Sequence, residues 1–234
     1  MKKLIVNADD FGITKSVNEG IIHGFKNGII TSTSLMVNRP FADEAAQLAK
    51  ENPKLGVGLH FEIIGDDNQV LRGIKKVTAY LSIGLFQVEK AKRLFYSQLK
   101  KFKESIGKMP THIDGHYHVH KLPSIFPFIS EFSNKYKIPY RMMKEINFIG
   151  EYSDYNHPEN ASIDYLTKIL KGLPDKVSEL MTHPGFSSDE LRKISSMSDC
   201  RATELKTLTS SEIKKIIEEE KIQLINWSQI DIMI

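Results

Sequence analysis

The chain has 234 residues, which is long enough for one large domain with its own hydrophobic core, and we expect a single domain over 1–234. Its 32 basic and 29 acidic residues leave a net charge of +3, which is too balanced to favour nucleic acid as a partner. The single cysteine, Cys200, excludes a disulfide within the chain and fits a reducing compartment. Because no stretch approaches the ~18 apolar residues of a membrane span, we expect a cytoplasmic protein without a membrane partner.

Short apolar runs alternate with amphipathic stretches along the chain. The run from Lys3 to Asn7 predicts a buried strand, and Thr14 predicts the cap of a helix that ends near Gly28. Further strands are expected at 30–37, 55–61, 112–116, 139–143, 177–183 and 222–227, and further helices at 40–52, 88–105, 122–136 and 210–220. Two long segments, 62–87 and 144–161, show no clear periodicity, and loops of that length are usually functional.

The fold class follows from this alternation. The predicted strands are apolar throughout, which is typical of a parallel sheet covered by helices. Two α/β folds compete at this length: a (β/α) barrel and an open doubly wound sheet. The first strand is followed by Asp9-Asp10-Phe11-Gly12 instead of a glycine-rich phosphate loop, which removes the main support for a nucleotide-binding sheet. We therefore predict a (β/α) barrel, distorted and with about seven strands.

Four of the eight histidines lie in the ten residues Thr111-His112-Ile113-Asp114-Gly115-His116-Tyr117-His118-Val119-His120. The period of two in a strand would send His112, Asp114, His116 and His118 to one face. Burying such a row is costly without a partner, and a divalent metal ion is a common partner for imidazole and carboxylate. The alternative is a set of solvated histidines on an edge strand.

Polar residues stand where predicted strands end, and parallel barrels carry their active sites at that rim. Asp9, Asp10, His60, His116 and His183 stand at such ends, and Arg141 lies in the predicted strand 139–143. One carboxylate and two imidazoles make a three-ligand metal site with open positions. The second of two adjacent aspartates would then remain free as a base. The alternative for this aspartate pair is a turn or a helix cap before Thr14.

Together these motifs resemble one known family. Asn7-Ala8-Asp9-Asp10-Phe11-Gly12, Gly58-Leu59-His60-Phe61, the histidine-rich run and Thr182-His183-Pro184-Gly185-Phe186 look like the YdjC/ChbG family of carbohydrate deacetylases, in order and spacing, over essentially the whole chain. Arg201 with Glu204-Leu205 resembles a further family pattern. Gly115 and Tyr117 depart from many relatives, which have serine and histidine there.

The resemblance implies a barrel related to polysaccharide deacetylases, a divalent metal ion, and removal of acetyl groups from N-acetylated sugars such as chitooligosaccharides. Asp10, His60 and His116 resemble the metal ligands, Asp9 the catalytic base and His183 the acid. Arg141 fits a substrate-binding or a base-orienting role. The resemblance implies magnesium, whereas two imidazoles suit zinc, cobalt or manganese better. It also makes a homodimer plausible, and the two irregular segments are expected to line the sugar cleft.

Two other functions are compatible with the same residues. One is a different metal-dependent barrel enzyme acting on sugars, such as an isomerase or another amidohydrolase. The other is a non-catalytic protein that binds sugar or metal. Asp9 argues against a pure binder, which has no need of a spare carboxylate beside a ligand. Release of acetate from an N-acetyl sugar separates a deacetylase from an isomerase.

Overall fold

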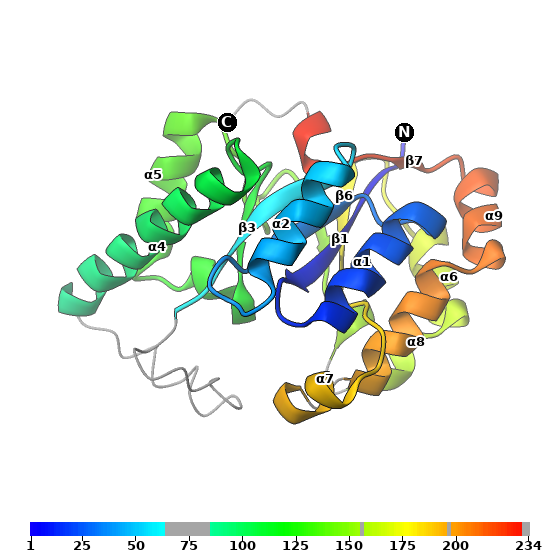
Figure 1. Cartoon of the computed structure of the whole chain (residues 1–234). Helices are drawn as coiled ribbons and strands as arrows, with labels where there is room; N and C mark the ends of the chain where they lie inside the picture. Colours follow the sequence, from blue (N-terminus) through cyan, green and yellow to red (C-terminus); the bar gives the residue numbers. More distant parts are fainter. Residues whose placement is uncertain (64–84, 155–156, 196–197, 231–234) are drawn as a thin grey trace.

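The computed structural model describes residues 1–63, 85–154, 157–195 and 198–230. Its centre is a curled seven-stranded sheet in the order β4-β3-β2-β1-β6-β5, with β7 also paired to β1, and all of these pairings are parallel (Figure 1). The strands are β1 Lys3–Phe11, β2 Ser32–Leu35, β3 Gly56–Phe61, β4 Ile113–Gly115, β5 Asn147–Ile149, β6 Val177–Thr182 and β7 Gln223–Leu224. The predicted distorted α/β barrel is confirmed.

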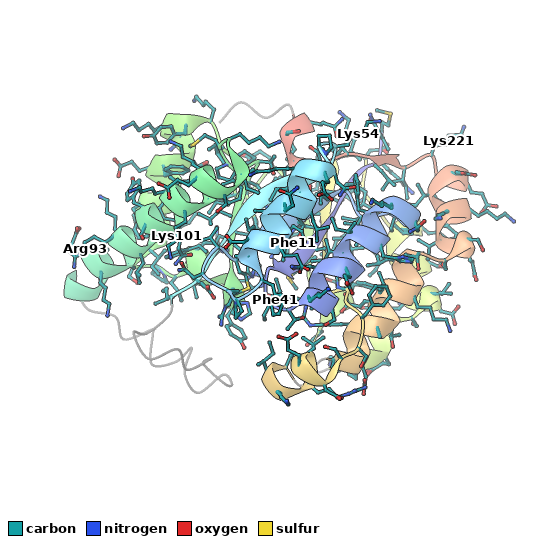
Figure 2. All side chains as sticks on the ribbon, viewed as in Figure 1. Phe11, Phe41, Lys54, Arg93, Lys101 and Lys221 are labelled. Atoms are coloured by element: carbon teal, nitrogen blue, oxygen red, sulfur yellow. The ribbon has the colours of Figure 1, made fainter. Side chains whose placement is uncertain are left out.

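Helices cover the outer face of this sheet (Figure 1). They are α1 Lys15–Asn27, α2 Ala42–Glu51, α4 Leu85–Ile106, α5 Phe126–Tyr136, α6 Ile163–Lys171, α7 Asp189–Ile194, α8 Ser198–Leu208 and α9 Ser211–Glu219, with 3-10 turns η1 His116–Lys121, η2 Glu151–Ser153, η3 Pro158–Ala161 and η4 Trp227–Gln229. Charged side chains such as those of Arg93 and Lys221 extend from the outer surface (Figure 2). None of the helices in the described ranges is long and apolar enough to cross a membrane.

Helix α1 shows how local sequence sets these elements. The side chain of Thr14 accepts a hydrogen bond from Val17 N at 3.2 Å and caps the helix, as predicted. Val17 and Ile21 lie on one face of the helix and are fully buried against the sheet. Burial of an aliphatic side chain contributes about 1.5–3 kcal/mol, so this face holds α1 in place. Gly28 follows the last turn as expected.

The buried strands alternate between apolar and polar side chains, which differs from the apolar pattern expected from the sequence. In β1, Leu4, Val6 and Ala8 belong to the main hydrophobic core under the helices. Asn7 and Asp9 face the other way, into the curl of the sheet, where they are buried with little exposure. The interior of the curl is therefore polar at the carboxyl ends of the strands, and the apolar core lies outside it.

A small apolar cluster closes the opposite end of the curl. It consists of Ile5, Ile146, Ile225 and Trp227. The Trp227 ring stacks on His112 with 4.7 Å between centroids and 13° between planes. A Cβ atom on Gly58 would lie 2.3 Å from the His112 ring, so only glycine leaves room for this imidazole. His112 is thus a packed residue below the rim.

We expect Gly58→Ala to lower the free energy of unfolding by about 1–3 kcal/mol, because the added methyl group must displace the His112 ring in a filled interior. Urea unfolding at equilibrium measures this loss. Gly172→Ala is the control, since its Cβ would meet no atom closer than 3.3 Å and its backbone is not left-handed. Equal stability of the two variants would contradict this account of Gly58.

Several boundaries differ from the predictions. The strand predicted at 139–143 is wrong: only an isolated bridge joins Tyr140 to Ile113, and Met142 then takes a left-handed φ of 63° that ends any extended run. Strand β5 lies instead inside the stretch 144–161 that was expected to be irregular, and it pairs with β6 at the other edge of the sheet. Helices α6, α7 and α8 were not predicted. Most of the other long segment, residues 64–84, lies outside the described residues.

Candidate active site

Asp9 and Asp10 reach the same site because β1 is irregular at its carboxyl end. Consecutive side chains of a regular strand point to opposite faces. Here the pairing register between β1 and β2 shifts between Ala8 and Phe11, and Asp10 has a left-handed φ of 68°. A left-handed non-glycine residue costs about 1–3 kcal/mol and tends to occur at functional sites. The irregularity turns both carboxylates toward the rim of the curl.

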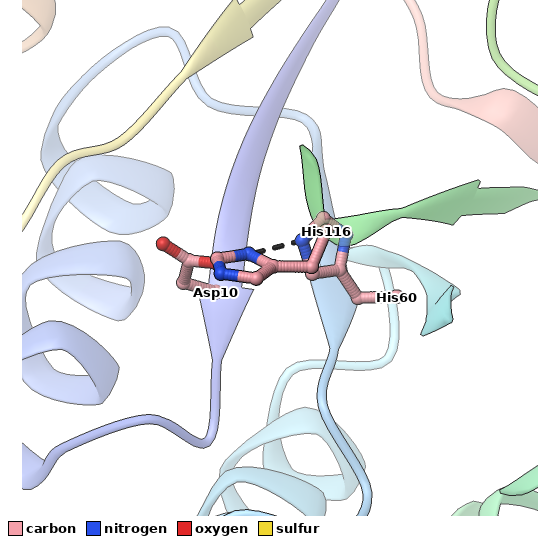
Figure 3. A group of neighbouring side chains, drawn as sticks. All are labelled: Asp10, His60 and His116. Atoms are coloured by element: carbon pink, nitrogen blue, oxygen red, sulfur yellow. Dashed lines mark ion pairs between the residues drawn. The ribbon is translucent and has the colours of Figure 1, made fainter. Parts of the chain in front are cut away.

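Asp10, His60 and His116 form a cluster of metal-ligand type (Figure 3). Oδ1 of Asp10 lies 3.4 Å from Nε2 of His60 and 3.1 Å from Nδ1 of His116. This oxygen is buried and has no hydrogen-bond partner among the described residues. A buried carboxylate oxygen without a donor is costly, and a cation between the three groups would satisfy it. The donor set therefore fits a divalent metal ion with open positions.

His60 is oriented from behind by Asp114. Nδ1 of His60 lies 2.8 Å from Oδ1 of Asp114, so its Nε2 faces Asp10. Ser34 donates a hydrogen bond of 2.6 Å to the other Asp114 oxygen. Burial alone would lower the pKa of His60, but the Asp114 and Asp10 carboxylates raise that pKa to about 10. The environment thus favours positive charge at this point, and a carboxylate behind a ligating imidazole is a common arrangement in metal sites.

Arg141 holds Asp9 in place. Its side chain is completely buried, and its two Nη atoms each lie 2.6 Å from one oxygen of Asp9. It also contacts Asp114 at 3.0 Å and Glu179 at 2.8 Å. Burial would raise the pKa of Asp9, but Arg141 lowers it below its ordinary value, so Asp9 is ionised. Of the two roles expected for Arg141, these contacts support orientation of Asp9, because no part of the guanidinium is exposed to a substrate.

A second group of ligand-type residues, Asp9, His60 and Asp114, also lies within reach of one cation. Both of its carboxylates already contact the Arg141 guanidinium. The guanidinium of Arg141 therefore already supplies a positive charge to this second group. The candidate metal site is the other cluster, formed by Asp10, His60 and His116.

His183 lies across from Asp9, directly after the end of β6. Its Nε2 is 3.9 Å from Oδ2 of Asp9, and its side chain is 17% exposed. Nδ1 lies 2.7 Å from Oγ of Ser153. Burial lowers the pKa of His183 to about 4, so the ring is neutral in the resting site. A partly exposed imidazole beside an ionised carboxylate is well placed to exchange a proton with a bound molecule.

Helix α8 contributes Arg201, which belongs to a sequence motif for which no role was predicted. Its Nη2 contacts Oδ2 of Asp10, the oxygen that faces away from the two imidazoles. Burial would raise the pKa of Asp10, but Arg201 and His116 hold it well below the ordinary value. Asp114 was visible in the sequence as a member of the histidine face. No sequence signal pointed to Glu179.

The histidine-rich run leaves its strand earlier than predicted. β4 ends at Gly115, and His116–Lys121 forms 3-10 turns in which Tyr117 and His118 have left-handed φ values of 53° and 55°. The alternation expected for the whole run therefore holds for His112 and Asp114 but not beyond Gly115. This turn brings His116 back toward Asp10, and Tyr117 remains 53% exposed at the rim.

The fold defines a structural class. A family 4 carbohydrate esterase from Streptomyces lividans in complex with acetate has the same fold and matches the chain with a TM-score of 0.56 and 11% identity, over 95% of this chain and 91% of the esterase. A crystal structure of an Enterococcus faecalis protein, provisionally named a cellobiose-phosphate cleavage protein, matches with a TM-score of 0.79 and 27% identity, over 97% of both chains.

Within this class the chain belongs to the YdjC-like protein family, whose sequence profile matches residues 3–219. A carbohydrate deacetylase of Clostridium beijerinckii is 36% identical over 97% of this chain and 100% of its own length. A chitooligosaccharide deacetylase of Proteus mirabilis is also 36% identical, over 94% of this chain and 96% of its own length. The family resemblance expected from the sequence motifs is confirmed.

Proposed function

We propose that this protein is a metal-dependent hydrolase that removes acetyl groups from N-acetylated carbohydrates of the chitooligosaccharide type and releases acetate and a free amino sugar. The observation that carries the proposal is the pairing of an ionised base with an unsatisfied ligand set. Asp9, held by Arg141, stands next to Asp10, whose Oδ1 faces His60 and His116 without a hydrogen bond from the described residues. The names of its relatives agree with this chemistry.

In this proposal Asp10, His60 and His116 hold the divalent ion. When bound, the ion supplies positive charge to the acetamide oxygen and makes a water more acidic. Two imidazoles and one carboxylate favour zinc, cobalt or manganese, whereas the family resemblance implies magnesium. The identity of the ion is therefore part of the experiment.

The protein's own groups then move one proton. Asp9 accepts it from the attacking water, and Arg141 keeps that carboxylate oriented and ionised between turnovers. Asp9 passes this proton to Nε2 of the neutral His183 ring, and His183 donates it to the amide nitrogen as the C–N bond breaks, because an amine leaves poorly as an anion. The distance of 3.9 Å between Nε2 of His183 and Oδ2 of Asp9 supports a transfer of the proton between these two groups. Water loses one proton and nitrogen gains one, so the step balances.

Removal of the metal tests the proposal. The chelated protein is expected to release no acetate from N,N′-diacetylchitobiose, and one of Zn²⁺, Co²⁺, Mn²⁺ or Mg²⁺ should restore release. His116→Ala should abolish this restoration of activity, because one of the three ligands is lost. His116 is chosen because its side chain is 23% exposed, so its loss disturbs the fold least. His157→Ala is the control, since this histidine is 59% exposed. Full activity of the chelated protein, or no acetate with any bound ion, would overturn the proposal.

A further inference from the structure

Helix α8 reaches the site a second time, through Glu204, one turn after Arg201. The Glu204 side chain is buried, with 1% of the residue exposed, and both of its oxygens are used. Oε2 accepts the backbone N–H of His183 at 2.6 Å. Oε1 accepts a hydrogen bond of 2.5 Å from Oγ of Ser153, a residue of η2. Glu204 thus binds the backbone of His183 directly and approaches its ring through Ser153.

The direction of these hydrogen bonds determines where His183 carries its hydrogen. A serine hydroxyl has one hydrogen to donate, and that of Ser153 goes to the Glu204 carboxylate. Toward Nδ1 of His183, at 2.7 Å, Oγ of Ser153 can then only accept. Nδ1 must therefore be the N–H of the neutral ring, and Nε2 carries the lone pair. The lone pair faces Oδ2 of Asp9.

We infer that Ser153 and Glu204 are positioning residues that hold His183 in the Nδ1–H tautomer, so that Nε2 can take up from Asp9 the proton lost by water and pass it to the departing amine. The inference rests on the proposed function for the acid role of His183. In the opposite tautomer Nε2 would already carry a hydrogen and could not receive one. Nothing is oxidised or reduced: one proton leaves the water and one N–H bond forms as the C–N bond breaks.

The negative charge of Glu204 also acts on the protonated ring. Once Nε2 has taken up a proton, the imidazolium still donates from Nδ1 to Ser153, and Ser153 still donates to Glu204. Hydrogen bonds from such an outer residue orient a reacting imidazole and stabilise its charged form. Asp9 lies on the other side of the ring, so the ring is held between two carboxylates, one direct and one through a hydroxyl.

Glu204→Gln is the sharpest test, because glutamine keeps the shape of the side chain. Its carbonyl oxygen still accepts the His183 N–H, but its amide nitrogen must donate to Ser153. Ser153 would then donate to Nδ1, and the ring hydrogen would move to Nε2. Nitrogen-15 NMR of histidine-labelled protein distinguishes the two tautomers, and His183→Gln assigns the signals. At about pH 8 Glu204 is ionised, since burial raises its pKa only to about 7.

We expect the wild-type spectrum to show Nδ1–H and the Glu204→Gln spectrum to show Nε2–H. We also expect kcat to fall about 10–100-fold in Glu204→Gln with little change in KM. Ser153→Ala should lose kcat similarly, and Ser153→Thr should restore it because the hydroxyl returns. Glu151→Gln, an exposed change in the same η2 segment, is the matched control.

An Nε2–H signal in the wild-type protein, or an unchanged tautomer and kcat in Glu204→Gln, would overturn the inference. The NMR measurement needs no turnover and therefore separates this inference from the proposed function. The expected tautomers without acetate release from any N-acetyl sugar would support the hydrogen-bond assignment and overturn the function. If Glu204→Gln does not fold, Ser153→Ala and Ser153→Thr give the same comparison.

Discussion

Asp9→Asn is expected to lower kcat for acetate release by about 10²–10⁴-fold, the usual contribution of a general base, while the protein still binds its divalent ion. Asparagine cannot take a proton from the attacking water. The ligand set of Asp10, His60 and His116 is not touched by the change, and the asparagine oxygen can still accept a hydrogen bond from Arg141. Steady-state kinetics and calorimetric titration with the restoring ion measure the two effects separately.

The matched control for this change is Asp43→Asn, which removes an exposed carboxylate from the first turn of α2. It should leave both kcat and metal affinity unchanged. Because Asp9 is buried against Arg141, the thermal midpoint of Asp9→Asn is measured as well, so that loss of fold is not read as loss of a base. Turnover near the wild-type value in a folded, metal-binding Asp9→Asn protein would show that another group accepts the proton.

Much of the fold was accessible from local sequence signals. The cap at Thr14 and the apolar face of α1 are properties of neighbouring residues, and the same holds for Ser210, whose side chain caps α9. Such signals do not depend on distant parts of the chain. The placement of Asp, His and Arg near strand ends followed from the parallel topology, because carboxyl ends of parallel strands meet at one rim.

What the sequence did not predict depends on contacts between distant segments. The strand expected at 139–143 fails because Arg141 turns inward to reach carboxylates on β1, β4 and β6. The left-handed backbone of Asp10 coincides with a shift in the pairing register between β1 and β2. This register cannot be predicted from the sequence of β1 alone. Arg201 and Glu204 lie about 190 residues after the aspartates in the chain, so their side chains reach Asp10 and the backbone of His183 only when α8 packs against α1 and η3.

Charge balance links the two arginines to the proposed ion. Four carboxylates contact them: Asp9, Asp114 and Glu179 at Arg141, and Asp10 at Arg201. With His60 neutral, as a metal ligand must be, four ionised carboxylates against two guanidinium groups leave 4 − 2 = 2 negative charges, whereas protonated His60 supplies one positive charge in the absence of the ion. Buried charge is costly unless it is paired. A divalent cation at Asp10 would neutralise this remaining charge. Protonation of Glu179 also reduces it, because burial raises the pKa of Glu179 to about 7 despite Arg141.

Arg141→Met is expected to lower the free energy of unfolding by about 3–5 kcal/mol in the metal-free protein, the usual cost of leaving a buried charge without its partner. Three carboxylates would remain in the interior with no guanidinium between them, although methionine fills most of the volume. The loss should also depend on pH. Urea unfolding at about pH 8 and about pH 5 measures both the size of the loss and its change.

The direction of the pH effect follows from the carboxyl pKa values. In the wild-type protein Arg141 lowers the pKa of Asp9 and Asp114, so their stabilisation is present above the unfolded pKa of about 3.9 and is lost only at lower pH. Without Arg141, burial raises these pKa values in the folded state. The folded variant then binds more protons than its unfolded chain, and its stability falls as pH rises through those raised values. The deficit should therefore be largest at about pH 8 and smaller at about pH 5.

Arg192→Met separates this effect from the loss of any arginine. Arg192 is 53% exposed and pairs with Asp189 at 3.1 Å on the surface, and an exposed pair contributes about 0–1 kcal/mol. Its removal should cost little at either pH. If Arg141→Met cost no more than Arg192→Met, or if its deficit were equal at the two pH values, Arg141 would not be the group that holds the interior carboxylates ionised. The ionised state of Asp9 in the metal-free protein would then have to come from His60, whose charge also lowers the pKa of Asp9.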